Sequence, residues 1–273
     1  MVKIPQHGEY WLWGDRSMPA GNKPRRELAH LSVLGTTQLH LKNPGIVAWW
    51  SCAFPGFGHL ILSKYLRALA LFLWEFLINT YAHLNEAIIY TITGQFDKAT
   101  EILETRWLSL YAPVYLFAVF DSYRTTVDMN HLYVLADREN APLSVFRMNA
   151  LDTNYMDKRN PLAAILWSIL MPGIGHLYIR RLLTAIVVLI SWVIIVIQSN
   201  ALISLHYTIL GNWDQVSSVL DKQWFLYIPS IYGFSIYDAY MNTVEHNKLF
   251  AREQKNYLTQ EYQSKQFIMP FKL

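Results

Sequence analysis

The sequence has little charge and almost no cysteine. Only 16% of its 273 residues are charged, whereas 53% are hydrophobic, and a soluble domain carries about a quarter charged residues. The single cysteine, Cys52, excludes an internal disulfide and a multi-cysteine metal site. The charges are also unevenly spread, and the long windows without them are candidates for membrane spans.

Recognisable catalytic motifs are also lacking. No glycine-rich loop carries the Lys-Ser/Thr of a phosphate-binding loop, and neither Gly-x-Ser-x-Gly nor HExxH occurs. The sequence therefore predicts no catalytic residue, no metal and no cofactor. The net charge of +3 is small and the basic residues are scattered, so nucleic acid is not an expected partner. The first forty residues contain no apolar stretch typical of a signal peptide, and we expect the first membrane segment to direct insertion.

An internal repeat organises the rest of the chain. Residues 55–60 read PGFGHL and residues 172–177 read PGIGHL, 117 positions later. At the same offset Asn43-Pro44 matches Asn160-Pro161, and Trp107 matches Trp224. About a quarter of the aligned positions are identical over roughly ninety residues without a gap, which indicates two copies of one unit.

Each unit contains three apolar segments. The first (residues 44–54 and 161–171) begins with Asn-Pro, a helix start, and is too short for a bilayer that needs about twenty residues. PGxG then breaks the helix. A long apolar helix follows (residues 65–93 and 182–210), and after an acidic stretch a third helix (residues 107–123 and 224–240). Helical tails are expected at residues 130–140 and 247–263, and a loop at 141–158.

The distribution of Lys and Arg decides the topology. If the short first segment enters the membrane and returns, 20 of the 23 Lys and Arg residues lie on one side, and only Lys98, Arg106 and Lys222 lie opposite. Positive residues concentrate on the cytoplasmic side. We therefore expect an all-α integral membrane protein with two tandem pseudo-symmetric units, each a short re-entrant helix plus two transmembrane helices. That gives four full spans in the cell membrane, with both termini cytoplasmic.

The predicted organisation has five parts. Residues 1–42 form a cytoplasmic or interfacial segment, 43–132 the first membrane unit and 133–158 a cytoplasmic linker. Residues 159–249 form the second membrane unit and 250–273 a cytoplasmic tail.

These residues resemble the bacterial TM-two domain family. PGFGHLILSKYLRA followed by FAVFDSY, and PGIGHLYIRRLLTA followed by FSIYDAY, are similar to its pattern of a glycine-rich turn, a histidine, a basic stretch and an aspartate in the last helix. The chain departs from it in having His-Leu-Ile or His-Leu-Tyr where the family has His-Arg-Phe-Tyr. The resemblance implies a membrane location and little about chemistry.

Two groups of polar residues are candidate sites. His59 with Asp121, and His176 with Asp238, can pair in a metal or proton-relay site in which the aspartate accepts from histidine Nδ1. Alternatively each pair is a structural latch that holds the short hairpin onto the third helix, which is the interpretation we favour because both copies keep it.

The second group is present in one unit only. Glu75, Asn79 and His83 are spaced four apart on the second helix, whereas the other copy has Trp192, Val196 and Asn200. A carboxyl group in a span is costly and indicates function; a hydrogen-bonded contact between helices is the alternative.

The predicted function is that of a non-enzymatic membrane scaffold or accessory protein. Its partners are the lipid bilayer and further copies of itself or other membrane proteins. A small transporter or an ion- or proton-permeation protein using these Glu, Asn, His and Asp residues is the first alternative, and a membrane enzyme acting on a lipid-like substrate is the second.

Overall fold

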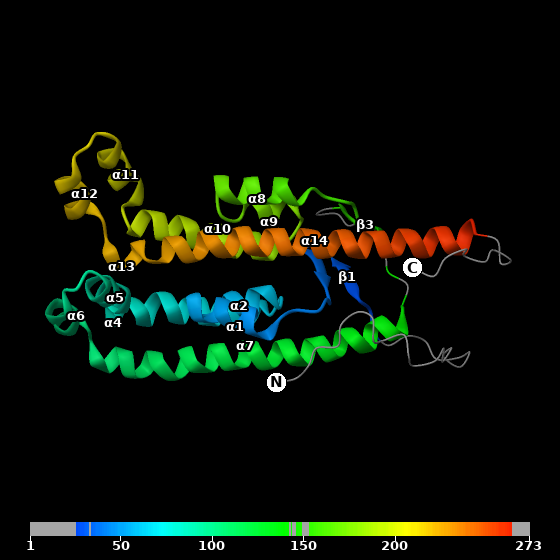
Figure 1. Ribbon diagram of the computed structural model, residues 1–273, viewed down its shortest axis with the longest axis horizontal. Coiled ribbons are helices and arrows are strands. Elements are labelled where there is room, and N and C mark those ends of the chain that lie inside the picture. Colours follow the sequence, from blue (N-terminus) through cyan, green and yellow to red (C-terminus); the bar gives the residue numbers. More distant parts are fainter. Residues whose placement is uncertain (1–25, 33, 142, 144–145, 149–152, 264–273) are drawn as a thin grey trace.

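The computed structural model describes residues 26–263 except 33, 142, 144–145 and 149–152. The described chain is mostly helical (Figure 1), which confirms the helical class. Two short β-hairpins add to it. The predicted N-terminal segment lies outside the described residues up to residue 25.

The helices repeat along the chain as two sets. The first set is α1 (Pro44–Ala53), α2 (Phe57–Ile61), α3 (Tyr65–Trp74), the π-helix η2 (Glu75–Asn79), α4 (Thr80–Ala82), α5 (Leu84–Ile92), α6 (Phe96–Ile102) and α7 (Thr105–Glu139). The second set is α8 (Pro161–Leu170), α9 (Ile174–Tyr178), α10 (Leu182–Gln198), α11 (Ala201–Ile209), α12 (Trp213–Val219), α13 (Lys222–Phe225) and α14 (Tyr227–Glu261).

The backbone follows the 117-residue offset closely. Helices α1, α2, α3, α5, α6 and α7 begin 117 residues before α8, α9, α10, α11, α12 and α13. Positive φ angles recur at the same offset, for example at Gly56 and Gly173 and at Ser63 and Arg180. The repeat inferred from sequence is therefore a repeat of structure.

The short first helices start as the sequence predicts. The side-chain oxygens of Asn43 and Asn160 accept from the backbone N–H groups of Gly45 and Leu162, each at 2.9 Å. Proline follows at the first helical position in both copies, where its missing donor costs nothing. Each helix has only ten residues, about 15 Å.

The prediction of one continuous second helix per unit is wrong. The chain breaks at His83 and at Asn200, both with φ of +53°. His and Asn tolerate this left-handed conformation better than most residues. The carbonyls of Ala82 and Ser199, freed by the break, accept from the backbone N–H groups of Glu104 and Asp221 at 3.2 and 3.1 Å. An apolar run contains no signal for a single left-handed residue.

The two units have the same orientation. Helices α7 and α14 run the same way along the molecule, and the α5–α6 and α11–α12 pairs lie at the end where both begin (Figure 1). Helices α7 and α14 continue without interruption into the tails that the sequence predicted to be helical.

No single described helix is both long and apolar enough to cross a bilayer. The pair Leu182–Gln198 and Ala201–Ile209 meets that requirement only together, with a 59° bend between its members.

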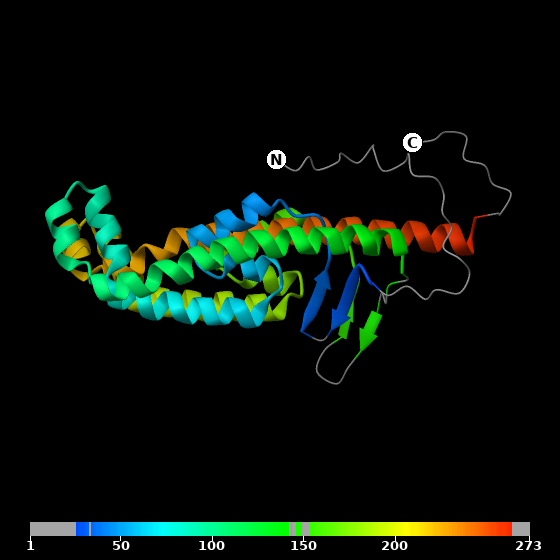
Figure 2. The same ribbon diagram turned by 90° about the horizontal axis from the view of Figure 1, so that it is seen from below.

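The hairpins are part of the repeat. Strand β1 (Ala29–Ser32) pairs with β2 (Gly35–Gln38), and β3 (Phe146–Met148) pairs with β4 (Thr153–Tyr155), both antiparallel. They lie together beside the second halves of α7 and α14 (Figure 2). The expectation of a loop over residues 141–158 is thus wrong for the strands. Strands of three or four mixed residues give almost no periodic pattern.

Apolar side chains form two main cores. The larger joins the units through aromatic rings, with Phe57 of α2 stacked on Phe234 of α14 at 4.1 Å between ring centroids. The smaller holds the first hairpin against the long helices through Leu28, Leu31 and Leu249. The larger core contains the first PGxGH turn, whereas the second turn packs against α14 through a small cluster of Ala164, Ile179 and Ala239.

Candidate functional site

Each histidine of the PGxGH motifs reaches the aspartate that the sequence paired with it. His59 Nε2 lies 3.0 Å from Asp121 Oδ2, and His176 Nε2 lies 3.0 Å from Asp238 Oδ2. Both imidazole rings are fully buried. We call these two pairs the His–Asp latches.

The prediction that each histidine uses Nδ1 to contact its aspartate is wrong, however. Nε2 rather than Nδ1 faces the carboxylate, and Nδ1 of both histidines has no hydrogen-bond partner in the described structure. The histidines lie on α2 and α9. Nε2, the ring nitrogen farther from the backbone, is the one that reaches the neighbouring long helix. No group of three or more His, Cys, Asp or Glu residues suited to a metal ion occurs in the described part of the chain.

An arginine completes each latch, from a different position in each unit. Arg67 Nη1 donates to Asp121 Oδ2 at 2.8 Å, and Arg181 Nη1 donates to Asp238 Oδ2 at 2.6 Å. The residue 117 positions after Arg67 is Thr184. The basic stretch after each PGxGH motif is visible in the sequence, but the sequence did not predict that its arginine pairs with the aspartate.

The two latches differ in burial. The side chain of Arg67 is 57% exposed, whereas that of Arg181 is 5% exposed. Arg181 also donates through Nη2 to the carbonyl of Leu60, at 3.3 Å. The second latch therefore connects the two units, and the first ties together elements of one unit.

Glu75 and Asn79 form a second, separate polar cluster. Asn79 Nδ2 donates to Glu75 Oε1 at 2.6 Å and to Asn85 Oδ1 at 3.1 Å. Glu75 and Asn79 are 3% and 1% exposed. Both lie in the π-helix η2, a geometry that occurs frequently at functional sites.

Gln223 of the second unit closes this cluster. Its Nε2 donates to Asn79 Oδ1 at 2.8 Å, its carbonyl accepts from Asn85 Nδ2 at 3.0 Å, and its Oε1 accepts from the Glu86 backbone N–H at 3.0 Å. The sequence did not indicate Gln223, because an isolated glutamine far along the chain carries no motif. The cluster is thus a hydrogen-bonded joint between the units.

His83 is not part of the cluster, contrary to the expected stripe. It is the left-handed residue at the helix break, its side chain is 45% exposed, and its Nδ1 lies 3.9 Å from Glu86 Oε2. Residues spaced four apart share a face only within one continuous helix. Because the helix breaks at His83, its side chain points away from Glu75 and Asn79.

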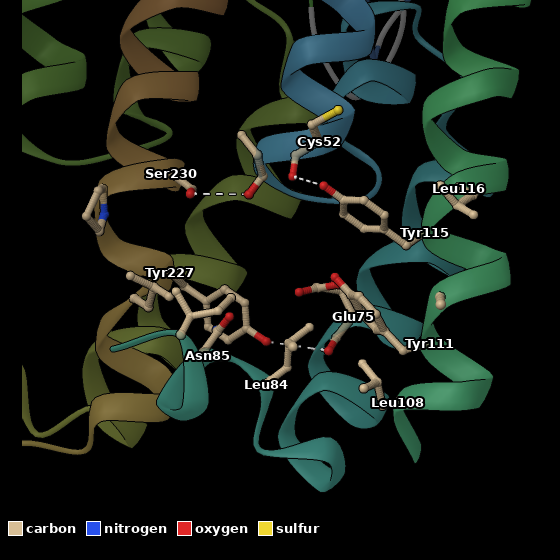
Figure 3. A pocket seen from close by; sticks show the side chains of 15 residues that line it. Cys52, Glu75, Leu84, Asn85, Leu108, Tyr111, Tyr115, Leu116, Tyr227 and Ser230 are labelled. Carbon is tan, nitrogen blue, oxygen red and sulfur yellow. Dashed lines mark hydrogen bonds between the residues drawn. The ribbon is translucent and has the colours of Figure 1, made fainter. Parts of the chain in front are cut away.

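A cavity of about 580 Å³ lies beside Glu75 (Figure 3). It is bounded by α1, α5 and α7 of the first unit and by the start of α14. Its polar lining consists mainly of Glu75, Asn85, Tyr111, Tyr115 and Tyr227, and the rest is mostly apolar. Tyr115 donates to the carbonyl of Cys52 at 2.9 Å.

One carboxyl oxygen in this cavity makes no close hydrogen bond in the described structure. Glu75 Oε1 accepts from Asn79, whereas Oε2 makes no hydrogen bond within 3.5 Å among the described residues, although the Tyr111 hydroxyl lies near enough to interact with the carboxyl group. Figure 3 shows the carboxyl group beside the Tyr111 ring and facing the space between α7 and α14. A buried polar atom without a partner costs free energy, so this oxygen is suited to bind a ligand.

The corresponding positions of the second unit carry bulky apolar side chains. Trp192 stands where the first unit has Glu75, and its ring packs edge-on against Tyr232 at 4.8 Å between centroids. Ile169 and Leu170 stand in place of Cys52 and Ala53. The chemistry of the Glu75 cavity is therefore specific to the first unit.

We expect Gln223→Ala to lower the free energy of unfolding by about 1–3 kcal/mol, because Asn79 and the Glu86 N–H lose partners in a buried site. Thermal unfolding of the purified protein measures this. Gln215→Ala, at an exposed position of α12, is the matched control and is expected to change stability by less than about 0.5 kcal/mol. Equal effects of the two variants would show that the joint contributes nothing.

No protein-family model, no curated protein and no solved structure matches this chain. The fold and the site define a helical protein of two tandem units with a buried carboxyl group in a cavity between them.

Proposed function

We propose that the chain is a multi-pass membrane protein with a non-enzymatic scaffold or accessory role. The observation that carries the membrane location is an extensive exposed apolar surface on the helices of both units. The following side chains on it are each more than half exposed: Leu66, Leu73, Leu77, Leu116, Phe117, Phe120, Leu162, Leu166, Leu170, Ile190 and Ile197. Apolar surface of this extent is typical of contact with a membrane or another protein.

The charges support a single orientation. Lys98 lies on α6, Arg106 at the start of α7 and Lys222 at the start of α13, all at one end of the long axis (Figure 1). The hairpins and the charged second halves of α7 and α14 lie toward the other end. The positive-inside rule then places the hairpins and both termini in the cytoplasm.

Within this proposal four segments cross the bilayer: α3 to α4, the first half of α7, α10, and the first half of α14. Helix α10 has 17 residues, about 25 Å, close to the hydrocarbon thickness of about 30 Å. The bends at His83 and Asn200 lead into α5–α6 and α11–α12, which lie at the outer surface. Helices α1 and α8 enter the bilayer, and after each of them the chain returns to the side from which it came.

The scaffold role is supported by the hydrogen bonds that buried polar groups form between the two units. Arg181 and Gln223 both bond across the boundary between units, and Asn154 of the second hairpin donates to the Ser32 carbonyl of the first at 2.9 Å. Hydrogen bonds between helices hold bundles together in membranes, and the Asn154 bond joins the two hairpins outside the bundle. Membership of the TM-two domain family is part of this proposal, on the basis of the paired histidines and aspartates.

A second role, binding or transport of a small molecule, is favoured by the Glu75 cavity. A carboxyl oxygen that makes no close hydrogen bond is a feature that a purely structural joint does not need. His83 does not contribute to a polar path, since it lies outside the cluster.

Cysteine labelling tests the proposed topology. In a Cys52→Ser background, Lys98→Cys is expected to react with a membrane-impermeant maleimide in intact cells, and Glu261→Cys only after permeabilisation. Both replaced residues are exposed, so burial in the fold protects neither of them from the reagent. Labelling of both from outside, or a protein that does not sediment with membranes, would refute the proposal.

A further inference from the structure

We propose that the cavity beside Glu75 binds an amphiphilic amine, with its protonated amino group on the Glu75 carboxylate and its apolar body against α5 and α7. This inference goes beyond the scaffold role, and it concerns a site that the His–Asp latches do not share.

The size and lining of the cavity fit one small amphiphile. Its volume of about 580 Å³ lies within the 300–1,000 Å³ of small-molecule sites, which are mostly apolar with a few convergent polar groups. Leu84 and Ile88 of α5 and Leu108 and Leu116 of α7 contribute apolar wall. The ligand therefore needs a polar head no larger than one group and a longer apolar body.

The sign of the head group follows from the charges present. No residue that lines the cavity in the described structure is Lys, Arg or His, and Glu75 is its single acidic group. A carboxylate buried without a counter-charge is strongly disfavoured, so the empty cavity favours the neutral acid form of Glu75. An ammonium group that donates to Oε2 supplies the counter-charge and favours the ionised form. An anionic head would be repelled at the same place.

Aromatic rings support the same sign. Tyr111 and Tyr115 both line the cavity and stack at 5.5 Å between ring centroids. The Tyr227 hydroxyl donates to the Glu75 carbonyl at 3.5 Å, which holds that ring at the cavity as well (Figure 3). A cation within about 6 Å of a tyrosine face is attracted by the ring.

The cavity opens through an apolar rim. Among its lining residues, Leu116 is 66% exposed and Ile88 is 37% exposed, whereas Glu75 is 3% exposed. An apolar chain can thus occupy the mouth while the amino head reaches the buried carboxylate. In the proposed topology the mouth lies at the outer edge of the bilayer, between α5 at the surface and the membrane-spanning part of α7, so the ligand enters from the lipid there.

Three photoreactive probes with the same chain test the inference. They are dodecylamine, dodecanol and dodecanoic acid, each with a diazirine at mid-chain, applied to the full-length protein in phosphatidylcholine nanodiscs. The labelled fraction is measured by intact mass, and the labelled peptides are mapped. The amine is expected to label α5 and α7 at concentrations at least about tenfold below those of the alcohol, because hydrogen bonds to charged groups are stronger than neutral ones.

The decisive variant is Glu75→Gln, which keeps the shape and removes the charge. It is expected to raise the amine concentration for half-labelling about 10- to 100-fold and to leave the alcohol unchanged. Glu86→Gln is the control, because it changes a carboxyl group of the same unit that does not line the cavity. It is expected to leave the half-labelling concentrations of the amine and of the alcohol unchanged. If Glu75→Gln does not fold, Leu116→Trp at the exposed mouth takes its place and is expected to reduce labelling of the cavity by all three probes.

Equal labelling by the three head groups, or amine labelling that Glu75→Gln leaves intact, would overturn the inference and indicate that the cavity accepts an acyl chain of any lipid. Labelled peptides outside the cavity would overturn it as well. Accessibility of Lys98→Cys and Glu261→Cys is independent of these results, so failure of this inference is distinguishable from failure of the membrane proposal.

Discussion

Asp238→Ala is expected to destabilise the protein by about 3–5 kcal/mol, because it leaves a buried arginine without its counter-charge. Asp238 and Arg181 have side chains that are 1% and 5% exposed. His176 loses its acceptor in the same variant. The loss is measured as a fall in the melting temperature of the purified protein and in its amount in membranes.

The first latch is the matched control. Asp121→Ala removes the corresponding contacts from His59 and Arg67, whereas Asp238 also accepts from Asn242 at 2.8 Å. Asp121 is 16% exposed and the Arg67 side chain is largely in solvent. Exposed ion pairs contribute about 0–1 kcal/mol. The cost is therefore expected to come mainly from His59 and to be smaller by about 2 kcal/mol or more. Equal losses from the two variants would contradict the role assigned to burial.

Replacing Arg181 as well separates the two contributions. Arg181→Met in the Asp238→Ala background removes the unpaired charge and is expected to recover a large part of the lost stability, because apolar replacements of buried ion pairs are often neutral. No recovery would mean that the contacts of Asp238 with His176 and Asn242, rather than the buried charge, dominate.

Gly58→Ala and Gly175→Ala are expected to cost about 3 kcal/mol or more each, since the added methyl group would overlap the backbone of the preceding helix. A Cβ at Gly58 would lie 2.7 Å from the Val47 carbonyl oxygen, and a Cβ at Gly175 would lie 2.6 Å from that of Ala164. Backbone atoms of a packed helix cannot move aside as a flexible side chain can.

Gly94→Ala and Gly211→Ala are the controls for this prediction. Both glycines have φ of +75°, and no atom lies within 4 Å of an added Cβ. Their expected cost is the conformational one alone, about 1–2 kcal/mol. If Gly58→Ala proved no worse than Gly94→Ala, close approach of α2 to α1 would not explain the second glycine of PGxG.

The same distances explain why the motif has two glycines. Gly56 and Gly173 have φ angles of +108° and +101°, so the first glycine allows the turn. The second has ordinary helical geometry and allows contact with the short helix before it. The sequence predicted the turn at the first glycine, but the packing role of the second is visible only in the fold.

Features with a local cause were predictable from the sequence. The Asn-Pro helix starts, the PGxG turns and the 117-residue repeat depend on backbone conformation and near neighbours, and the structure confirms them. The pairing of each PGxGH histidine with its aspartate was also predictable, because two copies of the same pair indicated a shared contact. The nitrogen used was not, since it depends on how α2 and α9 lie against the long helices.

The Glu75 site was predictable only in part. Glu75 and Asn79 stood out because a carboxyl group in an apolar run is unusual, and the structure brings them together. The spacing of four places His83 on the same face only if the helix is unbroken. Gln223, Tyr111 and Tyr227 come from elsewhere in the chain, and no spacing rule relates them to Glu75.

The sequence by itself determined the two-unit organisation, the helical class and the residues of the latches, because these follow from repetition, from apolar composition and from local backbone preferences. Only the tertiary structure decided which latch is buried, where the second helix of each unit breaks and that a cavity lies beside Glu75. The breaks depend on contacts within each unit, whereas the burial of the second latch and the shape of the cavity depend on how the two units pack. Burial and cavity shape are properties of that interface, and the side chains that form it are more than a hundred residues apart in the chain.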